Sequence, residues 1–214
     1  MTKKECILVL GAHSDDFVIG AGGTIAKYAQ EGKKIVSVVF SYGEKSHPWL
    51  KENVVQKFRA KEAFAASELL NCKTVFFDLK EGHFYEEYKE KGLEKDLLKI
   101  IKKEKPNKIF THSNEDPHPD HKAIYKIVLE LYDKANYKPE LYTYSVWNPI
   151  SLKTKFPALY VDIRKTFSTK LQALRTFKSQ QIHISYPVAL LFFRAIKNGI
   201  KTRSLFGEKF YRIK

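Results

Sequence analysis

The sequence predicts an α/β protein of the Rossmann-like type, with a mainly parallel sheet and helices on both of its faces. Short apolar segments alternate with longer amphipathic ones along the chain, which is the pattern of repeated strand–helix units. A chain of 214 residues is long enough for one domain with a substantial core. With 43% hydrophobic and 29% charged residues, the composition is globular rather than disordered or fibrous. We therefore expect a single domain over residues 1–214.

Six short apolar segments are predicted to be strands. Each is bounded by polar or turn-forming residues, and each is separated from the next by a longer segment. Strands that alternate with helices in this way lie parallel in one sheet. In chain order the predicted strands are Cys6–Leu10, Ile35–Phe40, Thr74–Phe77, Lys108–Thr111, Leu141–Val146 and Ala158–Ile163.

Six amphipathic segments are predicted to be helices. The clearest of them repeats apolar and small residues at helical spacing between Phe58 and Leu70. Gly32 can take the left-handed conformation after the first helix, and Pro106 follows the third. In chain order the predicted helices are Gly23–Glu31, Val54–Leu70, Leu93–Lys103, Lys122–Lys134, Thr166–Gln181 and Val188–Lys197.

The glycines of residues 20–23 follow a strand and open a predicted helix, as a dinucleotide-binding loop does. Their spacing is not G-x-G-x-x-G, and a bound pyrophosphate would face the carboxylates of Asp15 and Asp16. We therefore interpret these glycines as permitting a tight turn and close helix packing, not as an NAD site.

The charge is large and unevenly distributed. The net charge is +14, and residues 164–214 contain twelve Lys and Arg against one Glu. This basic C-terminal helical segment can attract an anionic substrate, nucleic acid or an anionic membrane, or it can simply be solvated surface. Cys6 and Cys72 form neither a zinc nor a disulfide pattern, and no apolar segment approaches the ~20 residues of a membrane span. With no secretory leader recognisable, we expect a cytoplasmic protein.

The first candidate site, Gly11–Asp16, stands where the first strand should end. Side chains at the carboxyl end of a central parallel strand line the usual ligand-binding edge of such a sheet. His13 and Asp16 are close enough in sequence to converge on one cation. The adjacent carboxylates of Asp15 and Asp16 are costly to bury without a cation, so the cluster indicates a metal, with one acid free for proton transfer. The alternative is an Asp helix cap beside a surface histidine.

The second candidate site, Asp116–His121, directly follows the strand Lys108–Thr111 and is expected at the same edge of the sheet. It contains two Asp and two His, stiffened by two prolines that fix φ. A Pro-rich turn that caps the next helix through Asp120 is the alternative, but capping requires no histidines. Together the two segments offer His, Asp and His as an open three-ligand site, which is how catalytic zinc is held.

These residues resemble the motifs of the PIG-L/LmbE-like zinc-dependent N-acetylglucosamine deacetylases. Ala12–Asp16 with Gly22–Thr24 resembles the family's AHPDDE…GGT, and His118–His121 resembles its HPDH. Ser14 and Phe17 replace the usual proline and glutamate, but neither position is a metal ligand in the family, so only the shape of the substrate is affected. Further similarity lies at Arg59–Ala63, Leu69–Asn71, Val161–Ile163, Lys170, Ser179–Gln180 and Gly207–Phe210.

The resemblance implies a role for each residue of the site. His13, Asp16 and His121 would bind Zn²⁺, although Fe²⁺, Co²⁺ or Ni²⁺ also suit such donors. Asp15 would be the general base as a zinc-bound water attacks the acetamide carbonyl. His118 would stabilise the oxyanion or act as the acid.

Two further residues receive supporting roles. Asp120 would fix the orientation of the His118 ring without itself binding the metal. Arg59 is predicted to bind a hydroxyl or phosphate of the substrate, with a surface salt bridge to Glu62 or Glu52 as the alternative.

The leading hypothesis is therefore a zinc-dependent N-deacetylase that acts on an N-acetylglucosamine-type conjugate, with phosphorylated and lipid-linked conjugates among the candidates. A metal-dependent phosphohydrolase or another amidase would use the same residues. The alternative to an enzyme is a protein that binds nucleic acid or an anionic membrane through the basic segment. No RNA-binding signature is present, so no nucleic-acid partner is expected. The segment Pro187–Phe193 beside Arg194 and Lys197 also suits peripheral membrane contact, and the favoured alternative is a core helix with a basic outer face.

Overall fold

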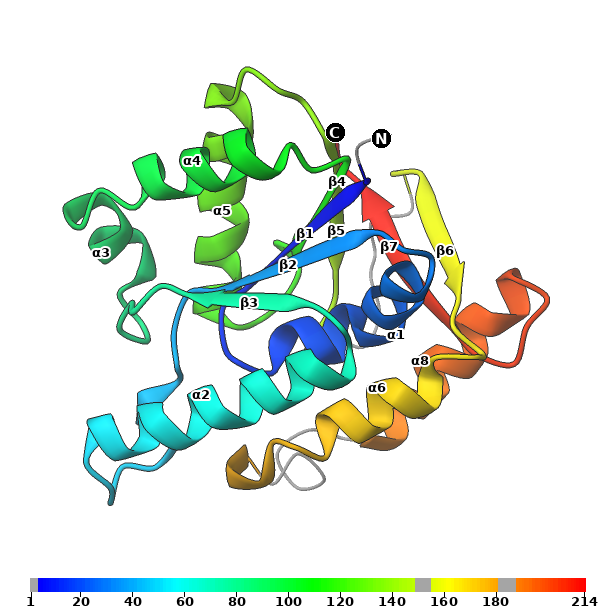
Figure 1. Cartoon of the computed structure of the whole chain (residues 1–214), viewed down its shortest axis with the longest axis horizontal. Coiled ribbons are helices and arrows are strands. Elements are labelled where there is room, and N and C mark those ends of the chain that lie inside the picture. Colours follow the sequence, from blue (N-terminus) through cyan, green and yellow to red (C-terminus); the bar gives the residue numbers. More distant parts are fainter. Residues whose placement is uncertain (1–3, 149–154, 181–187) are drawn as a thin grey trace.

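The sheet is the centre of the fold, and helices cover both of its faces (Figure 1). The computed structural model describes residues 4–148, 155–180 and 188–214. The predicted α/β class with a mainly parallel sheet is confirmed. In this part of the chain the seven strands are β1 (Cys6–Gly11), β2 (Lys34–Val39), β3 (Lys73–Phe76), β4 (Lys108–His112), β5 (Glu140–Tyr144), β6 (Ala158–Asp162) and β7 (Gly207–Arg212).

The strand order is β3-β2-β1-β4-β5-β7-β6. The first five strands in this order are parallel, whereas β7 is antiparallel to both β5 and β6. From β1 the chain extends the sheet in one direction through β2 and β3, and it later extends it in the other through β4 and β5. The point where the order reverses lies between β1 and β4, and open α/β sheets bind their ligands at the carboxyl ends of such strands.

The helices form two layers. In Figure 1, α1, α2 and α6 lie on one face of the sheet and α3, α4 and α5 on the other. The described helices are α1 (Asp16–Gln30), α2 (Glu52–Leu69), α3 (Phe84–Glu90), α4 (Glu94–Glu104), α5 (Pro119–Lys134), α6 (Phe167–Leu174) and α8 (Val188–Lys201), with short 3₁₀ turns at Glu44–Ser46 and Lys178–Gln180.

Each face of the sheet has its own apolar core, and β1 contributes to both. Ile7 and Val9 belong to the core under α1, α2 and α6. Leu8 and Leu10 belong to the core under α3, α4 and α5. Successive side chains of a strand point to opposite faces, so a strand that is apolar throughout is buried on both sides. This burial holds the end of β1 rigidly in place.

Helix α1 begins at Asp16, seven residues earlier than predicted, so the glycines lie inside the helix. The reason is close packing. A Cβ on Gly20 would lie 2.2 Å from the Tyr144 ring, and one on Gly23 would lie 2.7 Å from Ile163. The expectation of close helix packing was therefore right and that of a tight turn was wrong. The early start places both carboxylates of the first candidate site at the beginning of a helix.

The basic segment 164–214 is not entirely helical, because it also contains β7, which the sequence did not predict. Glu208 of strand β7 connects this strand to α1 through hydrogen bonds. The carboxylate of Glu208 accepts hydrogen bonds from the backbone N–H groups of Gly23 (3.1 Å) and Thr24 (2.7 Å). It also pairs with the buried ammonium of Lys170 at 2.6 Å. Two other differences are that α3 was not predicted and that α6 ends at Leu174; Gln181 and Pro187 lie outside the described residues.

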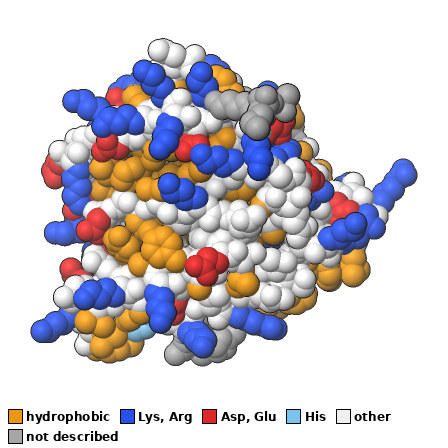
Figure 2. All heavy atoms as spheres, in the orientation of Figure 1, with side chains coloured by type: hydrophobic (Ala, Val, Ile, Leu, Met, Phe, Trp, Pro, Cys, Tyr) orange, Lys and Arg blue, Asp and Glu red, His pale blue; other side chains and the backbone are white. Residues whose placement is uncertain are grey.

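Helix α8 has an apolar outer surface rather than a purely basic one. Phe193 is 59% exposed and Ile200 is 70% exposed, and Lys197 and Lys201 lie beside them on the same helix. Over the face seen in Figure 2, Lys and Arg are scattered, with apolar patches between them. None of the described helices is both long and apolar enough to cross a bilayer.

Candidate functional site

The two candidate segments meet where the strand order reverses. Residues 12–16 follow β1, and residues 116–121 connect β4 to α5. Since β1 and β4 are parallel neighbours, both segments leave the same edge of the sheet. Helix α5 begins at Pro119, earlier than predicted, so Asp120 and His121 lie in its first turn and point back toward the end of β1. The fold thus brings together residues that are about a hundred positions apart in the sequence.

The three predicted ligands lie together and are buried. One carboxylate oxygen of Asp16, Oδ2, lies 3.4 Å from Nδ1 of His13 and 3.3 Å from Nε2 of His121. One donor atom from each residue lies within 4.8 Å of the other two. Nε2 of His121 is buried and makes no hydrogen bond to any described residue. Two imidazoles and a carboxylate, with a buried ring nitrogen that makes no hydrogen bond, fit a divalent cation.

Burial and mutual contact shift the pKa values of all three residues of this cluster. Burial alone would lower the pKa of His13, but the Asp120 and Asp16 carboxylates raise it to about 10. Burial likewise opposes protonation of His121, and Asp16 and Asp116 nevertheless raise its pKa to about 9. Burial would raise the pKa of Asp16, but the neighbouring His121 and His112 hold it well below its usual value. The raised pKa values of the two histidines reflect their contact with the buried carboxylates.

Metal binding is consequently expected to release protons. At pH 7.5 both His13 and His121 lie below their raised pKa values of about 10 and about 9 and are protonated, whereas a ligand imidazole must be neutral. About two protons should leave for each ion bound, and the apparent affinity should rise with pH up to about 10. Titration calorimetry with zinc in buffers of different ionisation enthalpy measures this number. Release of fewer than about half a proton would contradict the assignment.

Asp15 lies beside the cluster and faces a buried arginine. Its Oδ1 is 3.8 Å from Nη2 of Arg59, and the Asp15 side chain is 16% exposed. Burial raises the pKa of Asp15, whereas the Arg59 charge opposes the rise. A carboxyl group that is reachable from solvent and has a raised pKa suits proton transfer.

Arg59 bonds within the protein instead of facing solvent. It is 2% exposed, and its guanidinium donates to Oγ of Ser14 (2.8 and 3.1 Å) and to the carbonyl of Gly43 (3.1 Å). A Cβ at Gly43 would lie 2.4 Å from that guanidinium. The alternative salt bridge with Glu62 or Glu52 is not among the contacts of Arg59 within the described residues, and the contact with substrate stays a prediction. Ser14, which replaces the motif's proline, supplies the acceptor for Arg59.

Asp120 contacts a different histidine from the one predicted. Its Oδ2 lies 3.2 Å from Nε2 of His13, and its Oδ1 accepts the N–H of Gly82 at 3.0 Å. Only its backbone N–H reaches His118, donating to Nδ1 at 3.2 Å. His118 is therefore oriented as the helix cap of α5, and the carboxylate of Asp120 orients His13.

Three side chains of the site, two carboxylates and one imidazole, received no role in the prediction from sequence. Asp116 Oδ1 lies 2.9 Å from Nδ1 of His121, and its other oxygen accepts backbone N–H groups of Val146 and Trp147. His112, fully buried, accepts the Ala12 N–H at 2.9 Å and lies 3.3 Å from Asp16 Oδ2. Its position at the carboxyl end of β4 was the available signal.

The third unassigned group is Glu81, in the connection after β3. Its Oε1 lies 3.5 Å from Nε2 of His13. No motif surrounds it, so the sequence contains no signal for its contribution.

The chain is similar in sequence and in fold to several known enzymes. The model described as PIG-L, GlcNAc-PI de-N-acetylase, matches residues 8–132. A 4-oxalmesaconate hydratase of Pseudomonas putida is 28% identical over 96% of this chain and 84% of its own. The crystal structure of a P. putida 4-carboxy-2-hydroxymuconate hydratase, GalB, superposes with a TM-score of 0.81 at 23% identity, covering 98% and 96% of the two chains. The inhibitor complex of N,N'-diacetylchitobiose deacetylase from Pyrococcus horikoshii gives 0.80 at 25% identity, covering 96% and 82%.

Proposed function

The chain belongs to the PIG-L family, and from this premise we propose that it is a metal-dependent hydrolase that removes the acetyl group from an N-acetylated amino sugar. The observation that carries the proposal is the meeting of His13, Asp16 and His121 beside the carboxyl of Asp15. Three protein donors suit a catalytic ion, which needs a further position for water or substrate. The similarity to a chitobiose deacetylase over most of both chains supports the acetamide as the reacting group.

His13, Asp16 and His121 would hold the ion, zinc being the first choice for these donors. The bound metal would polarise the amide carbonyl and lower the pKa of water. Asp15 takes the proton of the attacking water on a carboxylate oxygen, and it returns that proton to the amide nitrogen so that the amine can leave.

His118 would stabilise the negative charge that develops on the carbonyl oxygen. Its Nδ1 accepts the backbone N–H of Asp120, so the proton of the neutral ring lies on Nε2. Burial and the neighbouring histidines His13 and His121 lower the pKa of His118, which favours this neutral form. A neutral ring can still donate one hydrogen bond from Nε2 to the oxyanion. The contacts of Arg59 with Asp15 and Ser14 support a role as a positioning residue.

The proposed function is tested by a screen of acetylated amino sugars in free, phosphorylated and nucleotide-linked forms. Release of the amine is followed for protein with zinc, for protein depleted by a chelator, and for depleted protein given zinc again. We expect at least one conjugate to be hydrolysed, with loss on depletion and recovery on addition of zinc. Hydrolysis that is insensitive to depletion would contradict the proposal.

Hydration of a carbon–carbon double bond is the second candidate, because the 28% identical relative is a 4-oxalmesaconate hydratase and spans 96% of the chain. The same groups would serve, since a carboxylate base and a metal also direct water to a conjugated carbon. The screen therefore includes an unsaturated dicarboxylate, followed by the loss of its ultraviolet absorbance. Absorbance loss without amine release from any sugar would replace the deacetylase by the hydratase.

We also propose that α8 makes peripheral contact with an anionic membrane. Phe193, Ile196 and Ile200 expose an apolar surface beside the lysines of the same helix, which is the arrangement of interfacial helices. Wild-type protein should float with vesicles containing anionic lipid at low salt. The double variant Ile196→Gln/Ile200→Gln should remain at the bottom of the gradient.

The control for this experiment is Phe64→Gln/Leu69→Gln, which removes two exposed apolar side chains from α2 instead. This control should float like the wild type. If wild-type protein does not float at low salt, α8 is not a membrane contact.

A further inference from the structure

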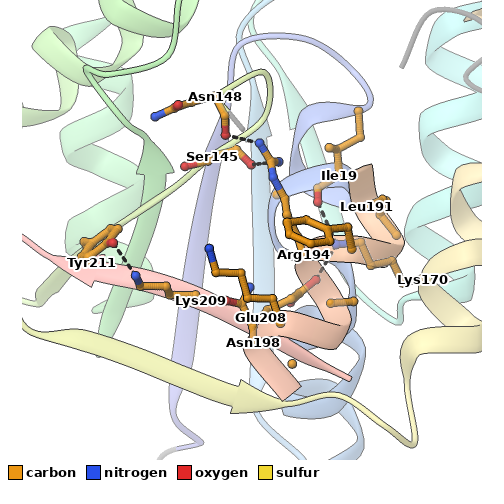
Figure 3. A pocket seen from close by; sticks show the side chains of 15 residues that line it. Ile19, Ser145, Asn148, Lys170, Leu191, Arg194, Asn198, Glu208, Lys209 and Tyr211 are labelled. Atoms are coloured by element: carbon orange, nitrogen blue, oxygen red, sulfur yellow. Dashed lines mark hydrogen bonds and ion pairs between the residues drawn. The ribbon is translucent and has the colours of Figure 1, made fainter. Parts of the chain in front are cut away.

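A cavity of about 140 Å³ lies between α8, the beginning of β7 and the segment that follows β5 (Figure 3). None of the residues assigned to the metal cluster lines it. Its volume corresponds to roughly four or five waters, since each occupies about 30 Å³ in the liquid. The cavity is therefore large enough for one small polar group, but not for a sugar conjugate.

Four basic side chains line the cavity, those of Lys170, Arg194, Lys197 and Lys209. Lys197 and Lys209 line it, and neither has a carboxylate within ion-pair distance among residues 4–148, 155–180 and 188–214. The ammonium of Lys209 donates to the hydroxyl of Tyr211, as Figure 3 shows, and that of Lys197 lies 5.9 Å from the centre of the Phe193 ring. Both are held by neutral groups, so their charges remain available to a ligand.

The one acidic side chain among the lining residues does not cancel these charges. Glu208 is already compensated by Lys170 at 2.6 Å and by the backbone N–H groups of Gly23 and Thr24. Its exposed fraction is only 6%. The described part of the cavity thus carries net positive charge.

The cavity and the metal cluster share one wall. The guanidinium of Arg194 donates to the carbonyls of Val146 (2.9 Å) and Asn148, and Figure 3 shows it reaching this segment from α8. The opposite side of the same segment donates its N–H groups to Asp116, which in turn contacts His121. The cluster lies at the ends of β1 and β4, which are three and two strand intervals from β7, so about 10–15 Å separates it from the beginning of β7.

We propose that this cavity is an oxyanion subsite, which binds a phosphate or carboxylate group of the substrate while the acyl group lies at the metal cluster. Lysine ammonium groups bind such oxygens through charge-assisted hydrogen bonds. A separation of about 10–15 Å matches an anionic group carried on the unit attached to the sugar ring. The binding of an anion stands on the cavity alone, whereas its assignment to the substrate rests on the proposed function.

Direct binding tests the subsite without any catalysis. Inorganic phosphate and succinate are titrated calorimetrically into the zinc-loaded wild type, into Lys197→Gln/Lys209→Gln and into Asp15→Asn. The Lys197→Gln/Lys209→Gln variant should bind at least about tenfold more weakly, since each charge-assisted hydrogen bond contributes more than the energy of a tenfold change. Asp15→Asn should bind as the wild type does. The better of the two anions identifies the chemistry of the group.

A matched control removes the same amount of charge elsewhere. Lys102→Gln/Lys103→Gln takes two exposed lysines from α4, on the other side of the sheet from α6, and should leave anion binding unchanged. Equal weakening in both double variants, or no anion binding to the wild type, would overturn the subsite. Thermal unfolding of both variants verifies that the fold is retained.

Steady-state kinetics then tests the assignment to the substrate. With an anionic acetylated conjugate, Lys197→Gln/Lys209→Gln should raise KM about tenfold and leave kcat unchanged, while a neutral conjugate should show no change. Equal effects on both conjugates would overturn the assignment. If no conjugate is hydrolysed by the wild type but phosphate binding still depends on the two lysines, the proposed function fails and the anion site stands.

Discussion

Replacing Asp15 by asparagine is expected to lower kcat for amide hydrolysis by about 10²–10⁴-fold, the contribution usual for a positioned general base. The amide has the size of the carboxyl but cannot accept the proton of the attacking water. Zinc affinity should be retained, because His13, Asp16 and His121 are untouched. Steady-state kinetics on the best conjugate of the screen, with the zinc content measured on the same samples, gives both quantities.

The control is Asp133→Asn, at a carboxyl whose side chain is 68% exposed and which lies near the opposite end of α5 from His121. It should leave kcat unchanged. If kcat of the Asp15→Asn variant stays within about threefold of the wild type, Asp15 is not the base, and this conclusion does not depend on the zinc content of the variant.

Replacing His121 by alanine is expected to abolish both zinc binding and hydrolysis. The substitution removes a ligand and leaves the buried carboxylates of Asp16 and Asp116 facing a gap. Loss of a residue that only orients a ligand typically costs 10–100-fold in metal affinity, so loss of the ligand itself should exceed about 100-fold. Equilibrium dialysis with zinc and elemental analysis of the purified variant measure the effect.

A graded series strengthens this test. Asp116→Asn should weaken zinc binding by about 10–100-fold, because Asp116 orients His121 without being one of the proposed ligands. The exposed His83→Ala should have no effect. The deeper set of His112, Asp116 and His121 also gathers donor atoms within 4.8 Å. If His13→Ala retains zinc and His112→Ala loses it, the ion belongs to that deeper set and the assignment of His13 is wrong.

Part of the architecture was predictable because it follows from local hydrophobic patterns in the sequence. The strands β1, β2 and β4 are short apolar segments whose predicted bounds differ from the observed ones by no more than a residue at either end. The two polar clusters follow β1 and β4 directly. Since the carboxyl ends of parallel strands share one edge, predicting the strands was enough to predict that the clusters would meet there.

The predictions were wrong where the surroundings of a residue are formed by segments that are distant in the sequence. The glycines of α1 look like a turn in sequence, but they lie in a helix because Tyr144 and Ile163 pack against them. Strand β7 mixes Glu, Lys and Arg with aromatic residues, so its hydrophobic pattern is weak. It is a strand because β5 and β6 offer it pairing on both sides, and because Glu208 finds Lys170 and the N–H groups of α1.

The sequence by itself determined three features. These are an α/β sheet, imidazoles and carboxylates at the ends of two of its strands, and a strongly basic C-terminal quarter. Only the tertiary structure decided which nitrogen faces which oxygen, that Asp120 contacts His13, that Arg59 is buried against Ser14, and that Lys197 and Lys209 line one cavity. The physical reason is that residue types and strand order follow from local pattern. The direction of a side chain and the charge of its surroundings depend instead on packing between segments that are far apart in sequence.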